Sequence, residues 1–289
     1  MKHALLLLVL LPLAACRAQP REIAITLDDV PLVGYYTYPD DFQRIQSIDS
    51  MTQALARHDA PYTVFAIGQD VAVEQEGALL DRWLDAGAHL GNHTYTHRNM
   101  GDLSVAEGIA DIERAGDVLQ PIADARGLSI RYFRFPFLAE GVSLEQKQAY
   151  ADALARMGLY NARVSVSNND WEFNERYRQA ELEEDWEGRY EIGQEYVLHI
   201  LESIKYWDMV GEELTGRSVR HVLLLHANRI NRDYLGAILD SLAADDYTFI
   251  DLDRAYADPI YAEPDRWPTE NGVSFLEHVR QTRRLEGTE

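Results

Sequence analysis

Short apolar runs alternate along the chain with longer segments in which apolar residues recur at helical spacing. The first pattern predicts buried strands and the second predicts amphipathic helices. We expect strands at residues 22–26, 63–67, 89–91, 131–133, 160–166 and 221–225, and one near Phe249. Strands that alternate with helices in this way indicate a parallel sheet with the helices packed outside it.

The expected helices lie between these strands, and several carry start or stop signals. We expect them at residues 40–58, 74–86, 104 to beyond 119, 143–158 and 232–244. Ser104 with Glu107, and Ser143 with Gln146, have the spacing of a capping box. Gly158 is a typical residue for a helix end. About seven strand–helix units favour an α/β barrel over an open sheet.

One long segment interrupts this alternation. Between Trp171 and Arg217 no strand pattern occurs, and Tyr196, Ile200 and Ile204 recur at helical spacing. We interpret residues 172–217 as a helical insertion that covers one side of the barrel. Its aromatic residues could stack on sugar faces or simply pack in the core: Trp186, Tyr190, Tyr196, Tyr206 and Trp207.

The first sixteen residues resemble an export signal. Lys2 is followed by an apolar run, residues 4–13, which is too short to span a bilayer. The run ends in Leu-Ala-Ala-Cys, which looks like a bacterial lipobox, and Cys16 is the only cysteine of the sequence. An ordinary signal peptide is the alternative. We expect Cys16 to carry the lipid anchor of an exported protein at the periplasmic face of the outer membrane.

The sequence thus divides into a signal peptide, residues 1–16, a linker, 17–21, a barrel, 22–257, and an extension, 258–289. The extension is rich in proline and charge, and we expect it to wrap the surface. Apolar residues make up 46% of the chain, which is enough for a large core. The formal net charge of -21 argues against nucleic acid as a partner, because phosphates need a basic surface. We expect a monomer.

Residues suited to metal-dependent hydrolysis follow five of the expected strands. In a parallel α/β barrel, the carboxyl ends of the strands meet at one face, where the chemistry of such folds occurs. These strand ends carry Asp28-Asp29, His93 with His97, Arg134 to Phe137, Asn168 to Trp171, and His226. His93 and His97 have the spacing of the H-E-x-x-H metal motif, but Thr94 takes the place of its glutamate.

These five motifs resemble those of the polysaccharide deacetylases, also called NodB-homology or carbohydrate esterase family 4 enzymes. The chain shows, in the family's order, TLDD at 26–29, HTYTH at 93–97, RFPF at 134–137, NDW at 169–171 and LLH at 224–226. The resemblance implies a distorted (β/α)7 barrel and a metal-dependent N-deacetylase that releases acetate from an N-acetylated polysaccharide or oligosaccharide.

The resemblance also implies roles for individual residues. Asp29, His93 and His97 would hold a divalent metal ion, for which zinc is the best candidate, and Asp28 would be the general base. Two imidazoles and one carboxylate leave positions open on the ion, as in catalytic zinc sites. Asp28 and Asp29 can both reach the site only if the strand ends there, because neighbouring strand residues point to opposite faces.

The remaining family positions would complete the catalytic and substrate-binding groups. Arg134 would pair with Asp28 and hold it ionised, and the backbone N–H of Phe137 would stabilise an oxyanion. His226 would be the general acid, oriented by Asp170. Trp171 and Leu224 would line a small apolar pocket for the acetyl methyl group. The other six histidines are expected to be structural or at the surface.

The fourth motif departs from the family pattern, because Ser167 stands where the family has its first aspartate. By the resemblance, the lost carboxylate concerns substrate contacts or the groups that surround the metal ligands, and not the metal ligands themselves. Two other functions remain open from the sequence. One is a metal-dependent amidase that acts on a small non-sugar amide, and the other is a non-catalytic sugar-binding lipoprotein with the same fold.

Overall fold

The computed structural model describes residues 20–270 and 272–287, so the segment with Cys16 lies outside the described residues. In this part of the chain seven parallel strands form one sheet, in the order β5-β4-β3-β2-β1-β6, and β7 also pairs with β1. The strands are β1 (Arg21–Val30), β2 (Tyr62–Ala66), β3 (His89–Asn92), β4 (Tyr132–Phe133), β5 (Tyr160–Asn161), β6 (His221–His226) and β7 (Tyr247–Ile250).

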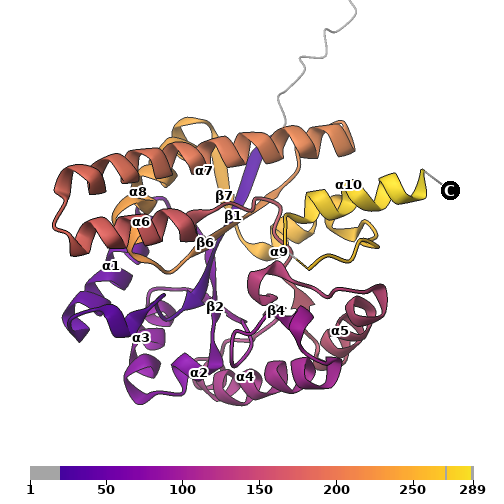
Figure 1. The fold of residues 1–289 in the computed structure, drawn as a ribbon, viewed down its shortest axis with the longest axis horizontal. Helices are drawn as coiled ribbons and strands as arrows, with labels where there is room; N and C mark the ends of the chain where they lie inside the picture. The colour runs from indigo at the N-terminus through magenta and orange to yellow at the C-terminus, as the bar shows by residue number, and fades with distance from the viewer. Residues whose placement is uncertain (1–19, 271, 288–289) are drawn as a thin grey trace, which may run out of the picture.

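Helices surround the sheet, which curls into a half-barrel (Figure 1). The helices are α1 (Asp41–Arg57), α2 (Gly68–Val71), α3 (Glu74–Asp85), α4 (Val105–Ala125), α5 (Leu144–Met157), α6 (Asp170–Leu182), α7 (Trp186–Thr215), α8 (Arg229–Ala244), α9 (Leu252–Tyr256) and α10 (Phe275–Glu286), with short 3-10 helices η1 (Tyr35–Thr37), η2 (Met100–Asp102), η3 (Pro136–Leu138) and η4 (Pro259–Ala262). This architecture is the distorted (β/α)7 barrel expected from the sequence. No helix among the described residues is both long and apolar enough to cross a membrane.

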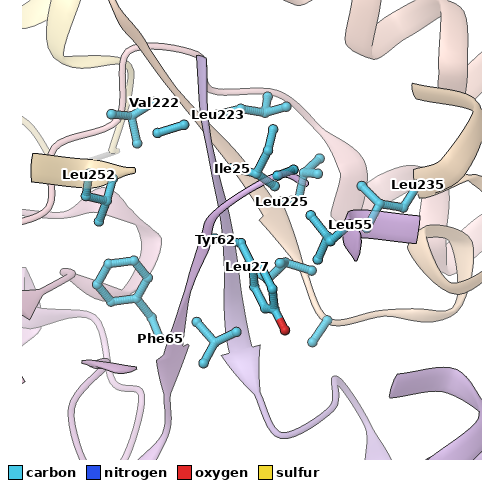
Figure 2. Packing of buried hydrophobic residues seen from close by; sticks show 14 of the residues in the cluster. Ile25, Leu27, Leu55, Tyr62, Phe65, Val222, Leu223, Leu225, Leu235 and Leu252 are labelled. Carbon is cyan, nitrogen blue, oxygen red and sulfur yellow. The ribbon is translucent and has the colours of Figure 1, made fainter. Parts of the chain in front are cut away.

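Strand β1 lies at the centre of the sheet and organises the core. Strand β6 pairs with β1 from Ile23 to Asp28. On β1, the first half pairs with β7 and the second half pairs with β2. Figure 2 shows Ile25 and Leu27 of β1 among buried side chains contributed by neighbouring strands and by α1 and α8. Because this core fixes β1 and β6 in register, it also fixes the residues at their carboxyl ends.

The capping signals are confirmed in part. Ser104 and Glu107 form the full capping box at the start of α4, each side chain accepting a hydrogen bond from the other residue's backbone N–H. Ser143 accepts a hydrogen bond from the backbone N–H of Gln146, but the Gln146 side chain accepts from Val142 instead of Ser143. The second helix therefore has an N-cap without the reciprocal bond.

The strand predicted at residues 160–166 is wrong beyond its first two residues. β5 ends at Asn161, and afterwards the chain pairs with other partners. The carbonyl of Val164 accepts a hydrogen bond from the N–H of Phe275, and Val166 forms an isolated bridge to Leu223 of β6. Alternating apolar residues there are buried as in a strand, but the sequence pattern could not show that their backbone partners differ.

The insertion is helical, as predicted, and consists of α6 and α7. Tyr196 and Trp207 of α7 are buried in the core, so the structure rules out sugar stacking for both. Trp186, Tyr190 and Tyr206 are exposed. The C-terminal extension contains η4 and α10, and α10 buries Phe275, Leu276 and His278.

Candidate active site

Asp28 and Asp29 lie at the carboxyl end of β1 and both face the same cavity. The expectation that the strand ends before them is wrong, because β1 continues to Val30. A bulge between Leu27 and Val30 breaks the register with β2, and Asp29 has a left-handed backbone with φ of 59°. The bulge interrupts the usual alternation of strand side chains, which is how two successive carboxylates reach one site.

Asp29, His93 and His97 converge on one point. Their nearest ligand atoms all lie within 4.8 Å of one another. Nε2 of His97 lies 3.0 Å, and Nε2 of His93 lies 3.4 Å, from Oδ1 of Asp29. Nδ1 of His93 lies 2.9 Å from the backbone carbonyl of Arg134. Since that carbonyl can only accept, Nδ1 of His93 carries a proton, and Nε2 is the ring nitrogen that faces Asp29.

This cluster fits a divalent metal ion. Oδ1 of Asp29 is buried and forms no hydrogen bond with any described residue, although two imidazole nitrogens are close to it. Burial raises the pKa of the Asp29 carboxyl, but the two neighbouring imidazoles lower it more, so the pKa lies well below its usual value. Two nitrogen donors and one ionised oxygen donor form the set that catalytic zinc sites use.

Thr94 and Asn92 shape the turn that carries the two histidines. The N–H of His97 donates to Oγ1 of Thr94 at 3.0 Å, and the N–H of Thr94 donates to Oδ1 of Asn92 at 2.9 Å. Thr94 and His97 both have left-handed backbone angles, with φ of 64° and 54°. The sequence analysis missed these positioning roles, for which the only signal was a polar residue on each side of His93.

Arg134 lies behind the cavity and holds Asp28. Its Nη1 donates to Oδ1 of Asp28 and to Oγ1 of Thr26, each at 2.8 Å, and its Nε donates to the carbonyl of Ala162 at 2.9 Å. Both Arg134 and Asp28 are buried. The other carboxylate oxygen, Oδ2, lies 3.8 Å from Nε2 of His93. Asp28 therefore has one oxygen fixed by Arg134 and one directed toward the candidate metal site.

His226, which lines the same cavity, forms a second polar pair with Asp170. Nδ1 of the His226 ring lies 2.6 Å from Oδ1 of Asp170, and the backbone N–H of His226 donates to Oδ2 of Asp170 at 2.9 Å. Burial lowers the pKa of His226, but Asp170, and the more distant Asp29 and Asp28, raise it to about 10. The imidazole is therefore protonated at neutral pH, with its Nε2 on the side away from Asp170.

Two asparagines that the sequence analysis did not single out complete the environment of Asp170. The side-chain amides of Asn228 and Asn231 each donate to Oδ2 of Asp170 at 3.2 Å. Asn228 also caps the N-terminus of α8, which begins at Arg229, three residues before the predicted start. An asparagine two residues after the strand end was the available signal for this cap.

A cavity of about 820 Å³ joins these groups, a size typical of small-molecule binding sites. Eight of the predicted site residues line it: Asp28, Asp29, His93, His97, Phe137, Trp171, Leu224 and His226. Arg134 and Asp170 are buried behind them. The ring of Phe137 packs 4.9 Å from that of His97, between centroids. The structure thus brings all ten predicted side chains to one place, while their roles remain predictions.

A model of the polysaccharide deacetylase family matches residues 16–160, half of the chain. The chain belongs to this family. The match includes the first three motifs, with Asp28, Asp29, His93, His97 and Arg134. The last two motifs lie beyond the matched residues. Membership places the chain in a family of hydrolases that act on amide bonds.

Solved structures of family members share the fold. Peptidoglycan deacetylase PdaC from Bacillus subtilis is 18% identical, with 93% of this chain and 96% of that chain aligned and a TM-score of 0.52. A family 4 carbohydrate esterase from Streptomyces lividans, solved with acetate, is 22% identical over 82% of this chain and 96% of that one, also with a TM-score of 0.52.

A third similar structure is a family pseudoenzyme. This protein from Bacillus anthracis is 15% identical, with 82% of this chain and 66% of that chain aligned and a TM-score of 0.56. The polysaccharide deacetylase fold is therefore shared by enzymes and by a protein described as inactive. Function has to be argued from the site of this chain rather than from its fold.

Proposed function

We propose that this protein is a metal-dependent N-deacetylase that hydrolyses the acetamide of N-acetylated sugar chains to an amine and acetate. The observation that carries the proposal is the convergence of two sets of groups on one cavity. Asp28, Asp29, His93 and His97 form one set, and His226 with Asp170 forms the other. Acyl transfer to water needs both a base and an acid, and the cavity supplies a candidate for each.

The metal site is assigned to Asp29, His93 and His97, and zinc is the ion that their donor set favours. When bound there, such an ion would supply Lewis acidity toward the acetamide carbonyl and lower the pKa of a water molecule. Asp29 stays ionised because its pKa is low, and His93 is held in the correct tautomer by the carbonyl of Arg134.

The proton transfers are assigned to Asp28 and His226. Oδ2 of Asp28 accepts the proton of the attacking water, while Arg134 keeps the carboxylate oriented through Oδ1. The backbone N–H of Phe137 stabilises the negative charge that develops on the carbonyl oxygen. His226 donates a proton to the departing amine nitrogen, since its raised pKa keeps the imidazole protonated at neutral pH. Trp171 and Leu224 contact the acetyl group.

We further propose that the protein acts outside the cytoplasm, anchored by a lipid on Cys16. The support is the sequence alone, with a short apolar run that ends in Leu-Ala-Ala-Cys. Cell fractionation of the wild-type protein and a Cys16→Ser variant tests this. We expect the wild type in the membrane fraction and the variant in the soluble periplasmic fraction.

Acetate release tests the proposed reaction. The purified protein is supplied with zinc and offered N-acetylglucosamine oligomers and, separately, small non-sugar amides. We expect acetate from the oligomers. Hydrolysis of small amides alone would identify an amidase. Sugar binding that survives in Asp28→Asn, without acetate release by either protein, would identify a sugar-binding protein.

A further inference from the structure

The C-terminal extension reaches the active site. We call residues 264–270 and 272–274 the C-terminal arm. Three of its residues, Glu270, Gly272 and Val273, line the catalytic cavity together with the predicted site residues. The extension therefore contributes directly to the surface that a substrate meets.

A buried ionic cluster anchors the start of the arm. Oδ2 of Asp265 lies 2.7 Å from Nζ of Lys147 on α5, and Oδ1 lies 3.1 Å from Nδ1 of His278 on α10. All three side chains are at least nine-tenths buried. Burial raises the pKa of Asp265, but His278 and Lys147 lower it more, so the carboxylate stays charged and paired. The arm is held by contacts that are costly to break.

The end of the arm is attached to the segment between β5 and α6. Oγ of Ser274 donates to the carbonyl of Ser165 at 2.6 Å, and the N–H of Phe275 donates to the carbonyl of Val164 at 2.6 Å. Val164 and Ser165 come shortly before the loop that carries Asn168 to Trp171. Glu270 lies between these two anchor points, is exposed, and lines the cavity.

The charges around the cavity are all negative apart from the histidines. Among the described lining residues there is no Lys or Arg, and the carboxylates are Asp28, Asp29, Glu175 and Glu270. Asp28 and Asp29 belong to the catalytic site. Glu175 is paired with Arg178, whose two nitrogens lie 2.7 and 3.0 Å from its carboxylate oxygens. Glu270 forms no ion pair with any described residue, so its charge remains available to a ligand.

We propose that Glu270 makes the site selective for amino-sugar chains that carry free amines beside the acetamide under attack. A carboxylate at the rim attracts an ammonium group and repels a carboxylate on the substrate, and a low-dielectric cleft strengthens both effects. This inference rests on the proposed deacetylation. The expected substrates are neutral to cationic glycans. The proposed deacetylation itself produces the amines that Glu270 binds.

Three glycans of equal length test the selectivity. They are an N-acetylglucosamine tetramer, a partly deacetylated tetramer, and an N-acetylated tetramer with carboxylates on alternate sugars. We expect the wild-type kcat/KM to be highest for the amine-bearing chain and lowest for the carboxylate-bearing chain. In Glu270→Lys the kcat/KM for the amine-bearing chain, divided by that for the carboxylate-bearing chain, should fall on the order of tenfold, mainly through KM. In Glu270→Gln this ratio of kcat/KM values should be intermediate.

Glu113→Lys is the matched control, because Glu113 is exposed on α4 and does not line the cavity. It makes the same change in net charge and should leave the ratio as in the wild type. A ratio that is the same in Glu270→Lys and wild type, with acetate still released, would overturn the inference alone. No acetate from any of the three glycans with the wild type would overturn the proposed function, and this inference with it.

Discussion

Nη1 of Arg134 lies 2.8 Å from Oδ1 of Asp28, and both side chains are buried at the carboxyl end of the central strand. The guanidinium also donates to Thr26 and to the carbonyl of Ala162, so its own position is fixed by three groups. Asp28 therefore keeps one oxygen for Arg134 and presents the other to the cavity. This arrangement suits a base that does not bind the metal itself.

Replacement of that base should abolish most activity without loss of metal. In Asp28→Asn the side chain keeps its shape, and its carbonyl oxygen can still accept from Arg134, but it cannot take a proton. We expect kcat to fall by about 10²- to 10⁴-fold, with zinc content unchanged. Steady-state acetate release and metal analysis of the same preparation measure both quantities.

Asp117→Asn is a suitable control for this change, because Asp117 is exposed on α4. It should retain wild-type kcat. If Asp28→Asn also keeps wild-type kcat, Asp28 is not the base.

The pH dependence of the rate should report on the His226–Asp170 pair. Asp170 is the main group that raises the pKa of His226, and the pKa lies at about 10 instead of its ordinary 6.5. A general acid donates its proton only below its pKa, so the wild-type kcat should stay constant as the pH rises until it nears the pKa of His226. In Asp170→Asn the pKa falls, and the alkaline decline should move to lower pH. A pH profile of kcat for both proteins checks this shift.

The same pair should also affect stability. Because the folded pKa of His226 is raised, its contribution to stability is fully present below the unfolded value of 6.5 and is lost as the pH rises toward about 10. Asp170→Asn should therefore lower the melting temperature more at pH 6 than at pH 10. An equal loss at both pH values would show that the charge pair contributes nothing.

Gly272 should matter because the C-terminal arm packs on the turn of Phe137. A Cβ at Gly272 would lie 1.8 Å from the carbonyl oxygen of Phe137 and 2.5 Å from Leu138. Phe137 and Leu138 both have left-handed backbone angles, with φ of 56° and 54°, so their turn is already strained. We expect Gly272→Ala to displace the Phe137 N–H and to reduce kcat by more than tenfold, with a smaller change in KM.

Gly116→Ala provides the comparison, because a Cβ at Gly116 on α4 would contact nothing within 4 Å. It should retain wild-type kcat. A simple loss of folded protein in Gly272→Ala would lower the active fraction without changing the KM of the remainder. Active-site titration by bound zinc separates that outcome from a displaced turn.

Much of the fold was predictable because its pattern is local. The runs that form β1, β2 and β6 are apolar and bounded by polar residues, and Ser104 with Glu107 marks a helix start by spacing alone. The candidate site residues follow strand ends, and parallel strands bring such residues to one edge. Their proximity therefore followed from sequence order once the strands were recognised.

The features that were missed depend on partners distant in the sequence. The bulge at Asp29 arises where β1 pairs with β2, and no residue near Asp29 signals it. Residues 162–166 alternate like a strand but bond to Phe275 and to β6. The arm is held at the cavity by pairings across the chain, such as that of Asp265 with Lys147 and His278. Long-range pairings of this kind leave no periodic pattern in the sequence.

The most direct test of the account is to measure zinc binding and acetate release together in His93→Ala. Wild type, His93→Ala and His89→Ala are stripped of metal, shown to be folded, and titrated with zinc before assay on N-acetylglucosamine oligomers. His89 is the control, since it is exposed at the other end of the same strand, β3. The account predicts that wild type and His89→Ala bind one zinc ion and release acetate, and that His93→Ala loses both. Retention of both zinc and activity by His93→Ala would contradict it.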